Sequence, residues 1–211
     1  GGSRSINGLL YVRGQKQDYD HWRQLGNAGW SYEDVLPYFK RAESNERGAD
    51  EFHGADGPLS VSDIPDRRAI CEAFIEAAVQ SGIPRNPDYN GATQEGVGYY
   101  QTTSYKGRRC SAAVGYLRPI LNRPNLRVEV NALSTRLLFD GKRATGVEYR
   151  QGDALKTVKA AKEIVLCGGA ITSPQLLQLS GIGPAAHLKS LGIEVLHDAP
   201  EVGANLQDHY Q

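Results

Sequence analysis

Three stretches of the chain repeat hydrophobic residues at helical spacing, namely residues 30–43, 67–82 and 111–121. In the first, Ser31 and Asp34 have the spacing of a helix-capping pair, so we expect the helix to begin there. Gly82 is placed to end the second helix, and Ser111 to cap the third. The apolar side of the second helix is predicted to consist of Ile70, Phe74, Ala77 and Ala78.

Alternating apolar and polar residues predict strands farther along the chain. Residues 125–160 alternate in this way around a turn at Asp140 and Gly141, which predicts a three-stranded β-meander. Residues 163–167, EIVLC, are almost continuously apolar and predict a buried strand that runs through Gly168 and Gly169 into a helix. A further strand is predicted near Leu59, and a short helix followed by a strand within residues 187–200.

Between the predicted helices lies a stretch that fits no regular element. Residues 83–98, IPRNPDYNGATQEGVG, are rich in Pro, Asn and Gly, and such long loops tend to be functional or to lie at an interface. The mixture of helices, a meander and a strand–turn–helix predicts an α/β (α+β) fold.

Composition narrows the class of protein. The 211 residues carry 24 Lys and Arg and 24 Asp and Glu, a formal net charge of zero, which argues against a nucleic-acid partner. No apolar run approaches the roughly 20 residues that a transmembrane helix needs. The three cysteines are predicted to be buried or reduced, and the spacing of the five histidines argues against a metal site.

The turn at Gly168 and Gly169 is the first candidate for binding chemistry. A strand that enters a helix through two glycines brings backbone N–H groups and the helix dipole to one point, where an anion can bind. The same turn can also serve close packing alone, and it lacks the GxGxxG spacing of a complete dinucleotide fingerprint.

Four motifs, in order, resemble landmarks of the glucose–methanol–choline (GMC) oxidoreductases, a family of FAD enzymes. They are GGSRSINGLLYVRG at residues 1–14, GRRCSAAVGYLRP at 107–119, GAITSPQLLQLSGIG at 169–183 and VGANLQDH at 202–209. The stretch DYDHWRQLGNAGWSYEDVLPYFKRAE is similar to the bacterial choline dehydrogenase-like branch. The resemblance covers essentially the whole chain.

This resemblance implies a partial GMC fold. It assigns residues 1–54 and 109–200 to an FAD-binding, Rossmann-like domain that includes the meander. Residues 55–108 would belong to a substrate-binding sheet domain, and residues 201–211 would cross back towards it. It also implies an internal part of a longer protein, with the ADP-binding turn upstream and the catalytic histidine downstream, so the chain alone is expected to be inactive. The absence of methionine points the same way.

The resemblance carries site residues with it. The positions implied to contact the cofactor are Gly1, Gly2, Ser3, Asn7, Gly8, Leu10, Ser134, Gly168, Gly169, Asn205 and Asp208. For Asn205 and Asp208, a role as cap and turn residues is an equal alternative. Arg4 departs from the small residue usual in the family, and His209 is assigned no catalytic role. Ile6 stands where some relatives carry a histidine joined to the flavin, so the FAD is expected to be non-covalent.

The implied activity is the oxidation of an alcohol. Hydride would pass from a primary alcohol or choline-like substrate to flavin N5, giving an aldehyde, and electrons would leave to O₂ or a quinone-type acceptor. Tyr99, Tyr100 and Gln101 are candidates for the substrate wall. A free-standing α/β ligand-binding module without redox activity is the alternative. Exposed apolar faces, unpaired strand edges and self-association are also expected if the chain folds alone.

Overall fold

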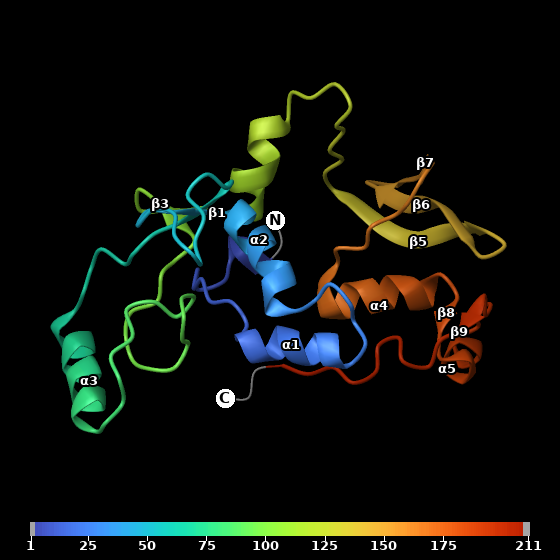
Figure 1. Cartoon of the computed structure of the whole chain (residues 1–211). Coiled ribbons are helices and arrows are strands. Elements are labelled where there is room, and N and C mark those ends of the chain that lie inside the picture. The colour runs from blue at the N-terminus through green and yellow to red at the C-terminus, as the bar shows by residue number, and fades with distance from the viewer. Residues whose placement is uncertain (1–2, 209–211) are drawn as a thin grey trace. The chain divides into compact units, whose positions relative to one another are not determined.

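The computed structural model describes residues 3–208, which form two compact units, one up to Arg127 and one from Val128 onward (Figure 1). The first unit contains three α-helices, α1 (Lys16–Gln24), α2 (Tyr32–Ala42) and α3 (Ala69–Gln80), and a short 3-10 turn at Ser3–Ser5. None of the helices in residues 3–208 has the length and apolarity to cross a membrane.

The predicted capping pair begins α2. The Ser31 hydroxyl accepts a hydrogen bond from the backbone N–H of Asp34, and the Asp34 carboxylate accepts one from the Ser31 N–H. Each bond satisfies a backbone donor that the first helical turn leaves unpaired. Helix α1 packs against α2 through Tyr19 and Phe39, whose ring centroids are 5.8 Å apart. The predicted helix is therefore confirmed.

Short strands connect the helices of the first unit. Strand β1 (Glu43–Asn45) pairs in parallel with β2 (Leu59–Val61), and β3 (Ser104–Tyr105) forms a hairpin with β4 (Arg108–Arg109). A small hydrophobic core lies beside β2. It consists of Tyr11, Leu59, Val61 and Cys110, with Val114 packed against them.

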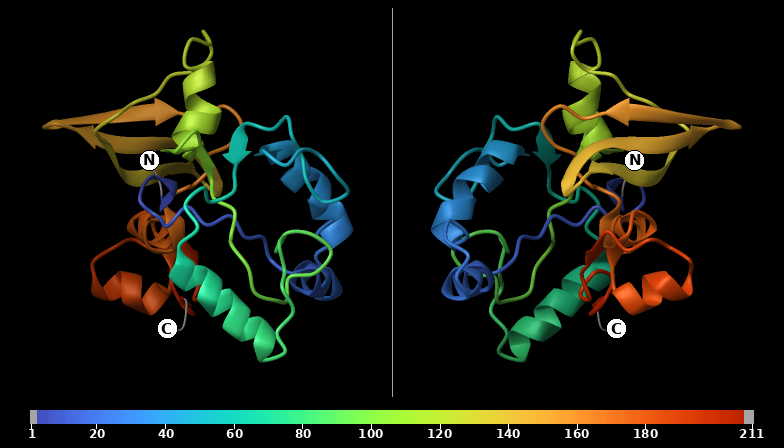
Figure 2. Two further views of the ribbon diagram at one scale, coloured as in Figure 1. Left: turned by 90° about the vertical axis from the view of Figure 1, so that its left-hand side faces the viewer. Right: turned by 90° about the vertical axis from the view of Figure 1, so that its right-hand side faces the viewer.

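Residues 83–98 form the irregular loop that the composition predicts, with one isolated bridge between Arg85 and Val97. Figure 2 shows this loop returning from the end of α3 towards α1. Asn86 organises it, because its side-chain amide donates to the carbonyls of Thr93 and Glu95. The loop is thus ordered by its own side chains rather than by a ladder of backbone bonds.

Two helix predictions for this unit need correction. In α3, Ile70 and Phe74 are 74% and 70% exposed, and Ile75 is the buried residue. Apolar residues surround this helix on more than one side, so the spacing did not identify the packed side. The segment after Ser111 is not one α-helix but a π-helical turn at Ala113–Leu117 followed by a 3-10 turn at Arg118–Ile120, where Pro119 has no N–H to continue an α-helix.

The second unit contains the predicted meander. Strands β5 (Ala132–Asp140), β6 (Arg143–Gln151) and β7 (Ala154–Lys159) form one antiparallel sheet in sequence order. Helix α4 (Gly169–Leu179) packs against β5, and the hydroxyl of Ser180 accepts a hydrogen bond from the N–H of Leu137. The remaining elements are β8 (Ile182–Gly183), α5 (Ala185–Ser190) and β9 (His197–Asp198).

Two strand predictions for this unit are wrong. Residues 125–131 lie outside the sheet, and residues 163–167 form no strand. Val165 is 73% exposed, and Cys167 is exposed rather than buried. A strand exists only with a hydrogen-bonded neighbour, and no segment within residues 3–208 pairs with 163–167. Of the three cysteines, all without disulfides, Cys110 alone is buried.

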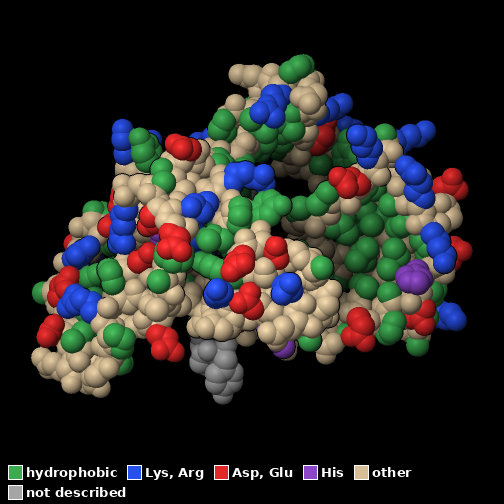
Figure 3. Space-filling view, viewed as in Figure 1, with side chains coloured by type: hydrophobic (Ala, Val, Ile, Leu, Met, Phe, Trp, Pro, Cys, Tyr) green, Lys and Arg blue, Asp and Glu red, His purple; other side chains and the backbone are tan. Residues whose placement is uncertain are grey.

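The expected exposed apolar surface is present in the second unit. Figure 3 shows hydrophobic side chains gathered on its visible face. The exposed large hydrophobic residues here are Val128, Val130, Leu133, Leu155, Val158, Val165, Ile171, Leu179, Leu191, Leu196 and Leu206. Strand β7 is exposed along its whole length and has no second neighbour among the described strands. An open edge with apolar side chains is a template for pairing with another chain.

We therefore expect the 211-residue chain on its own to self-associate through β7. Replacing Val158 with Lys places a charge on this edge and is expected to shift sedimentation velocity towards the monomer. The matched control is Thr157→Lys, which adds the same charge at the neighbouring position, on the opposite face of the strand. Equal sedimentation of both variants and the original chain would contradict a role for Val158 in the association.

Candidate functional site

The first candidate site is the loop at residues 3–10. The N–H of Asn7 donates to the carbonyl of Ser3 over 2.8 Å, which closes the turn. Leu9 has a left-handed backbone with φ of 70°, a conformation that costs a residue other than glycine of order 1 kcal/mol or more. Its N–H donates to the side-chain oxygen of Asn7 over 3.1 Å. Strain held in this way is a feature of ligand-binding loops.

Residues far along the chain hold this loop in place. The guanidinium of Arg109 donates to the Arg4 carbonyl over 3.0 Å, to the Asn7 side-chain oxygen over 3.1 Å and to the Asn7 carbonyl over 2.8 Å. The carbonyl of Leu9 accepts from the N–H of Thr103 over 2.8 Å. The loop is therefore attached to the segment around β3 and β4 on both sides of its strained residue.

The outer side of the loop is open. A Cβ atom placed on Gly8 would meet nothing within 4 Å. Ile6 and Leu10 are 86% and 57% exposed, and Asn7 is exposed between them. Two apolar side chains around an open glycine and a polar amide match a flat ring with apolar faces and polar edges, so the residues present fit a flavin. Arg4 differs from these exposed residues, because its Nη1 is buried without a hydrogen-bond partner among the described residues.

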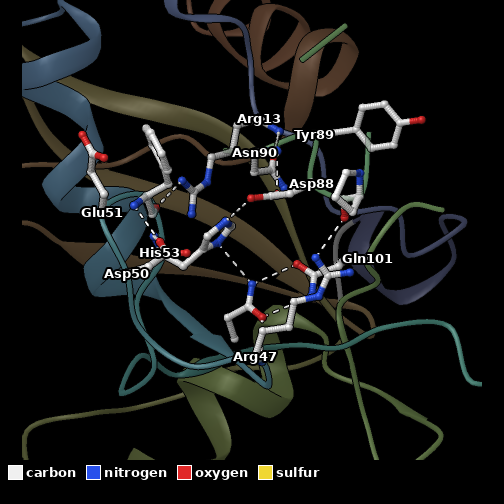
Figure 4. A network of polar contacts seen from close by, with 12 residues as sticks. Arg13, Arg47, Asp50, Glu51, His53, Asp88, Tyr89, Asn90 and Gln101 are labelled. Atoms are coloured by element: carbon white, nitrogen blue, oxygen red, sulfur yellow. Dashed lines mark hydrogen bonds and ion pairs between the residues drawn. The ribbon is translucent and has the colours of Figure 1, made fainter. Parts of the chain in front are cut away.

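A buried polar network follows directly after this loop (Figure 4). Arg13 forms an ion pair with the fully buried carboxylate of Glu43, with 2.5 Å between Nη2 and Oε2. The side-chain amide of Asn90 bonds the backbone at two positions. It accepts from the Arg13 N–H over 2.8 Å and donates to the Tyr11 carbonyl over 2.9 Å. The long loop is thereby joined to the strand-like segment that leaves residues 3–10.

His53 lies between two carboxylates in this network. Its Nδ1 is 3.1 Å from an oxygen of Glu43, and its Nε2 is 3.0 Å from Asp88. Hydrogen bonds to Asp88 and Glu43 raise the pKa of His53 to about 9, so the imidazolium form is favoured at neutral pH. Burial alone would raise the pKa of Asp88, but the hydrogen bond and charge of His53 lower it. His53 forms ion pairs with Glu43 and Asp88, and we interpret these contacts as stabilising the fold.

The candidates for the substrate wall lie in different surroundings. Gln101 is buried and is bonded to Asn45 and Asp63, so it belongs to the polar network. Tyr100 is 40% exposed, and its ring lies 4.8 Å from that of Tyr89. Tyr99 is half-buried, and the guanidinium of Arg67 lies over its ring at 5.2 Å from the centroid. Of the three, Tyr100 alone is exposed.

A cleft of about 640 Å³ opens beside the network, between residues 13–17, the start of α2 and residues 89–95. None of the residues predicted to contact FAD lines it. It is therefore separate from the loop at residues 3–10.

In the second unit, the predicted glycine turn begins α4. Gly169 is the first residue of the helix and has a φ of 84°, which favours glycine, and a Cβ there would meet nothing within 4 Å. The N–H of Gly168 donates to the Ser173 hydroxyl over 3.0 Å. The backbone is thus open to close approach by a ligand at Gly169, whereas a Cβ on Gly168 would lie 3.1 Å from the Ser173 nitrogen.

The other predicted contact residues of this unit lie in a strand and a turn. Ser134 is exposed on β5 beside a register shift in the sheet, and such bulges are common next to binding sites. Asn205 has a φ of 55°, and its amide donates to Glu201 over 3.0 Å, which fits the alternative of a turn residue. Asp208 is exposed. Gly1, Gly2 and His209 lie outside the described residues.

Sequence reasoning missed the side chains that hold the first loop. Arg109 is 102 positions from Asn7, and Arg13 is 30 positions from Glu43. No local spacing links such pairs. The only available signal was the unusual density of Asn and Asp in residues 83–98, which are capable of ordering a loop through their side chains.

Comparisons with known proteins agree with this geometry. The family described as GMC oxidoreductase matches residues 1–211. The oxygen-dependent choline dehydrogenase of Sinorhizobium fredii is 50% identical over the whole chain, which spans 38% of that relative's length. Pyridoxine 4-oxidase from Mesorbium loti has a similar structure, with a TM-score of 0.91 and 33% identity over 95% of this chain and 40% of that protein.

A fungal aryl-alcohol oxidase gives a TM-score of 0.90 at 28% identity, covering 99% of this chain and 38% of that protein. The mixed α/β fold is thus part of the fold of these oxidoreductases. Because the family match extends over every residue, this chain belongs to the GMC oxidoreductase family.

Proposed function

We propose that the protein carrying this chain is an FAD-dependent oxidoreductase that oxidises a primary or choline-like alcohol to an aldehyde. The observation that carries the proposal is the loop at residues 3–10, with its open glycine, exposed apolar flanks and strained, firmly attached backbone. Membership of the GMC oxidoreductases favours this enzyme over a ligand-binding module without redox activity.

Residues of the loop at 3–10 contact different parts of the flavin. Ser3, Asn7, Gly8 and Leu10 form the surface for the flavin, with Leu10 against its apolar face and Asn7 at a polar edge. By resemblance to the family, we also assign Gly1 and Gly2 to contact with the cofactor. Ile6 has no nucleophilic atom, so no covalent bond to the flavin forms there and the cofactor is held non-covalently.

Backbone groups of the second unit contact the rest of the cofactor, beyond the flavin ring. Gly168 and Gly169 admit the dinucleotide close to the start of α4, and the main chain of Ser134 meets the adenine. Asn205 and Asp208 lie near the cofactor, where the chain crosses between two domains. We assign residues 1–54 and 109–200 to the FAD-binding domain and residues 55–108 to the substrate-binding domain. When bound, FAD supplies a hydride acceptor at N5, and the electrons then leave to O₂ or a quinone-type acceptor.

The test uses protein expressed from its complete gene. We expect a purified protein with the visible absorption of oxidised flavin, released into solution when the protein is denatured by acid. Anaerobic addition of choline, an aliphatic alcohol or an aromatic alcohol is expected to bleach this absorption with at least one of them. Absence of flavin, or flavin that no alcohol bleaches, would contradict the proposed activity, and flavin that stays attached after denaturation would contradict the role of Ile6.

A further inference from the structure

The polarity of the loop at residues 3–10 is determined by Arg109. A guanidinium has only donors, and so has the backbone N–H of Leu9. Both contact the same terminal atom of the Asn7 side chain, over 3.1 Å each. That atom must therefore be the amide oxygen, and the amide nitrogen is the free end of the side chain.

Arg109 also occupies the carbonyl oxygens of the loop. It bonds the main-chain oxygens of Arg4 and Asn7, so both acceptors are used within the protein. The next residue, Gly8, is exposed, and its N–H makes no hydrogen bond within residues 3–208. The loop thus presents two neighbouring donors, the Asn7 amide nitrogen and the Gly8 N–H, while three nearby acceptors are satisfied.

We propose that Arg109 is a positioning residue that orients Asn7, so that the Asn7 amide nitrogen donates to an electron-rich edge of the bound flavin. The inference rests on the proposed function. Hydrogen-bond donors at the ring stabilise the reduced flavin, which carries more negative charge, over the oxidised one. Arg109 therefore acts through Asn7 on both the affinity for FAD and the reduction potential.

The structure supplies a variant that isolates the donor. In Asn7→Asp, one carboxylate oxygen still accepts from Arg109 and Leu9, so the attachment of the loop is kept while the NH₂ group becomes an acceptor. Arg109→Gln removes the attachment itself, and Arg109→Lys retains a charge without the planar fork. Arg108→Gln is the matched control, because Arg108 is exposed and its side chain has no bond among the described residues.

The experiment measures the FAD dissociation constant and the flavin reduction potential for protein from the complete gene. Asn7→Asp and Arg109→Gln are each expected to weaken FAD binding roughly 10-fold or more, the loss of one to two good hydrogen bonds. Both are also expected to lower the potential, with Arg109→Lys intermediate and Arg108→Gln unchanged. In the double variant the two effects should be less than additive, because they act through one group.

The Asn7 and Arg109 variants test separate parts of the proposal. If Asn7→Asp binds FAD with unchanged potential, the donor assignment is wrong. If Arg109→Gln equals Arg108→Gln, Arg109 does not position the loop. Should Arg109→Gln fail to fold, Asn7→Asp and Arg109→Lys decide the same question. A wild-type protein that binds no FAD would instead overturn the proposed function, and this inference with it.

Discussion

Replacing Glu43 with Gln is expected to lower the free energy of unfolding by about 3–5 kcal/mol. The Glu43 side chain is fully buried, and its carboxylate faces the Arg13 guanidinium, the His53 ring and the amide of Asn45. Arg13 and His53 are themselves 6% and 4% exposed. Without the Glu43 carboxylate, Arg13 and His53 lose the counter-charge that they share, in a nearly water-free place. The resulting loss of stability exceeds that from breaking an ion pair on the surface.

Urea unfolding monitored by fluorescence measures the effect. Glu51→Gln is the matched control, since Glu51 is exposed and lies close to the same network. The control is expected to change stability by less than about 0.5 kcal/mol. If both variants lose the same small amount, the Arg13–Glu43–His53 cluster does not stabilise the fold.

Stability is expected to fall as the pH rises from about 6.5 to about 9, because of His53. Its pKa is 6.5 in an unfolded chain and about 9 in the folded one, chiefly through hydrogen bonds to Asp88 and Glu43. A group that binds its proton more tightly when folded contributes its full stabilisation below the lower pKa and loses it through the higher one. The expected loss is on the order of 2–3 kcal/mol.

Asp88 shapes the acid side of the same profile. Its pKa is lowered below 3.8, so its contribution is present above that pH and is lost as the pH falls further. The network is therefore most stabilising between about pH 4 and pH 6.5. Above this window the unfolded chain gives up the His53 proton while the folded protein keeps it until about pH 9, so the stabilisation declines over that range. Below the window Asp88 takes up a proton as the pH falls through its lowered pKa.

The measurement is urea unfolding across this pH range for the wild type, His53→Gln and His21→Gln. His53→Gln should flatten the decline above pH 6.5 and lower stability at neutral pH, since Gln carries no charge to pair with Glu43. His21 is exposed on α1, so His21→Gln should keep the wild-type profile. A wild-type profile in the His53→Gln variant would show that another group titrates.

The network also holds the segment that follows the loop at residues 3–10. Asn90 bonds the backbone of Tyr11 and Arg13, and Gln94 donates to the carbonyl of Arg13 over 2.7 Å. The network therefore anchors residues 11–13, which come directly after the candidate flavin surface. Glu43→Gln is therefore expected to loosen this surface as well as the core.

The outcome of the sequence predictions follows from the range of each interaction. The cap at Ser31 and the meander around Gly141 depend on residues a few positions apart, and both are present. The strand predicted at residues 163–167 depends on a neighbouring strand, and its own composition contains no information about that partner. Apolar spacing alone likewise left the packed side of α3 undecided.

By itself the sequence determined the cap of α2, the meander, the family and the positions implied to contact FAD, because motifs and periodicity act between residues close in the chain. Tertiary structure decided which end of the Asn7 amide is free. It placed Arg109 against Asn7 across 102 positions and His53 between Glu43 and Asp88. Such contacts depend on how distant segments meet, and buried polar groups then pair because leaving them unpaired costs more than folding tolerates.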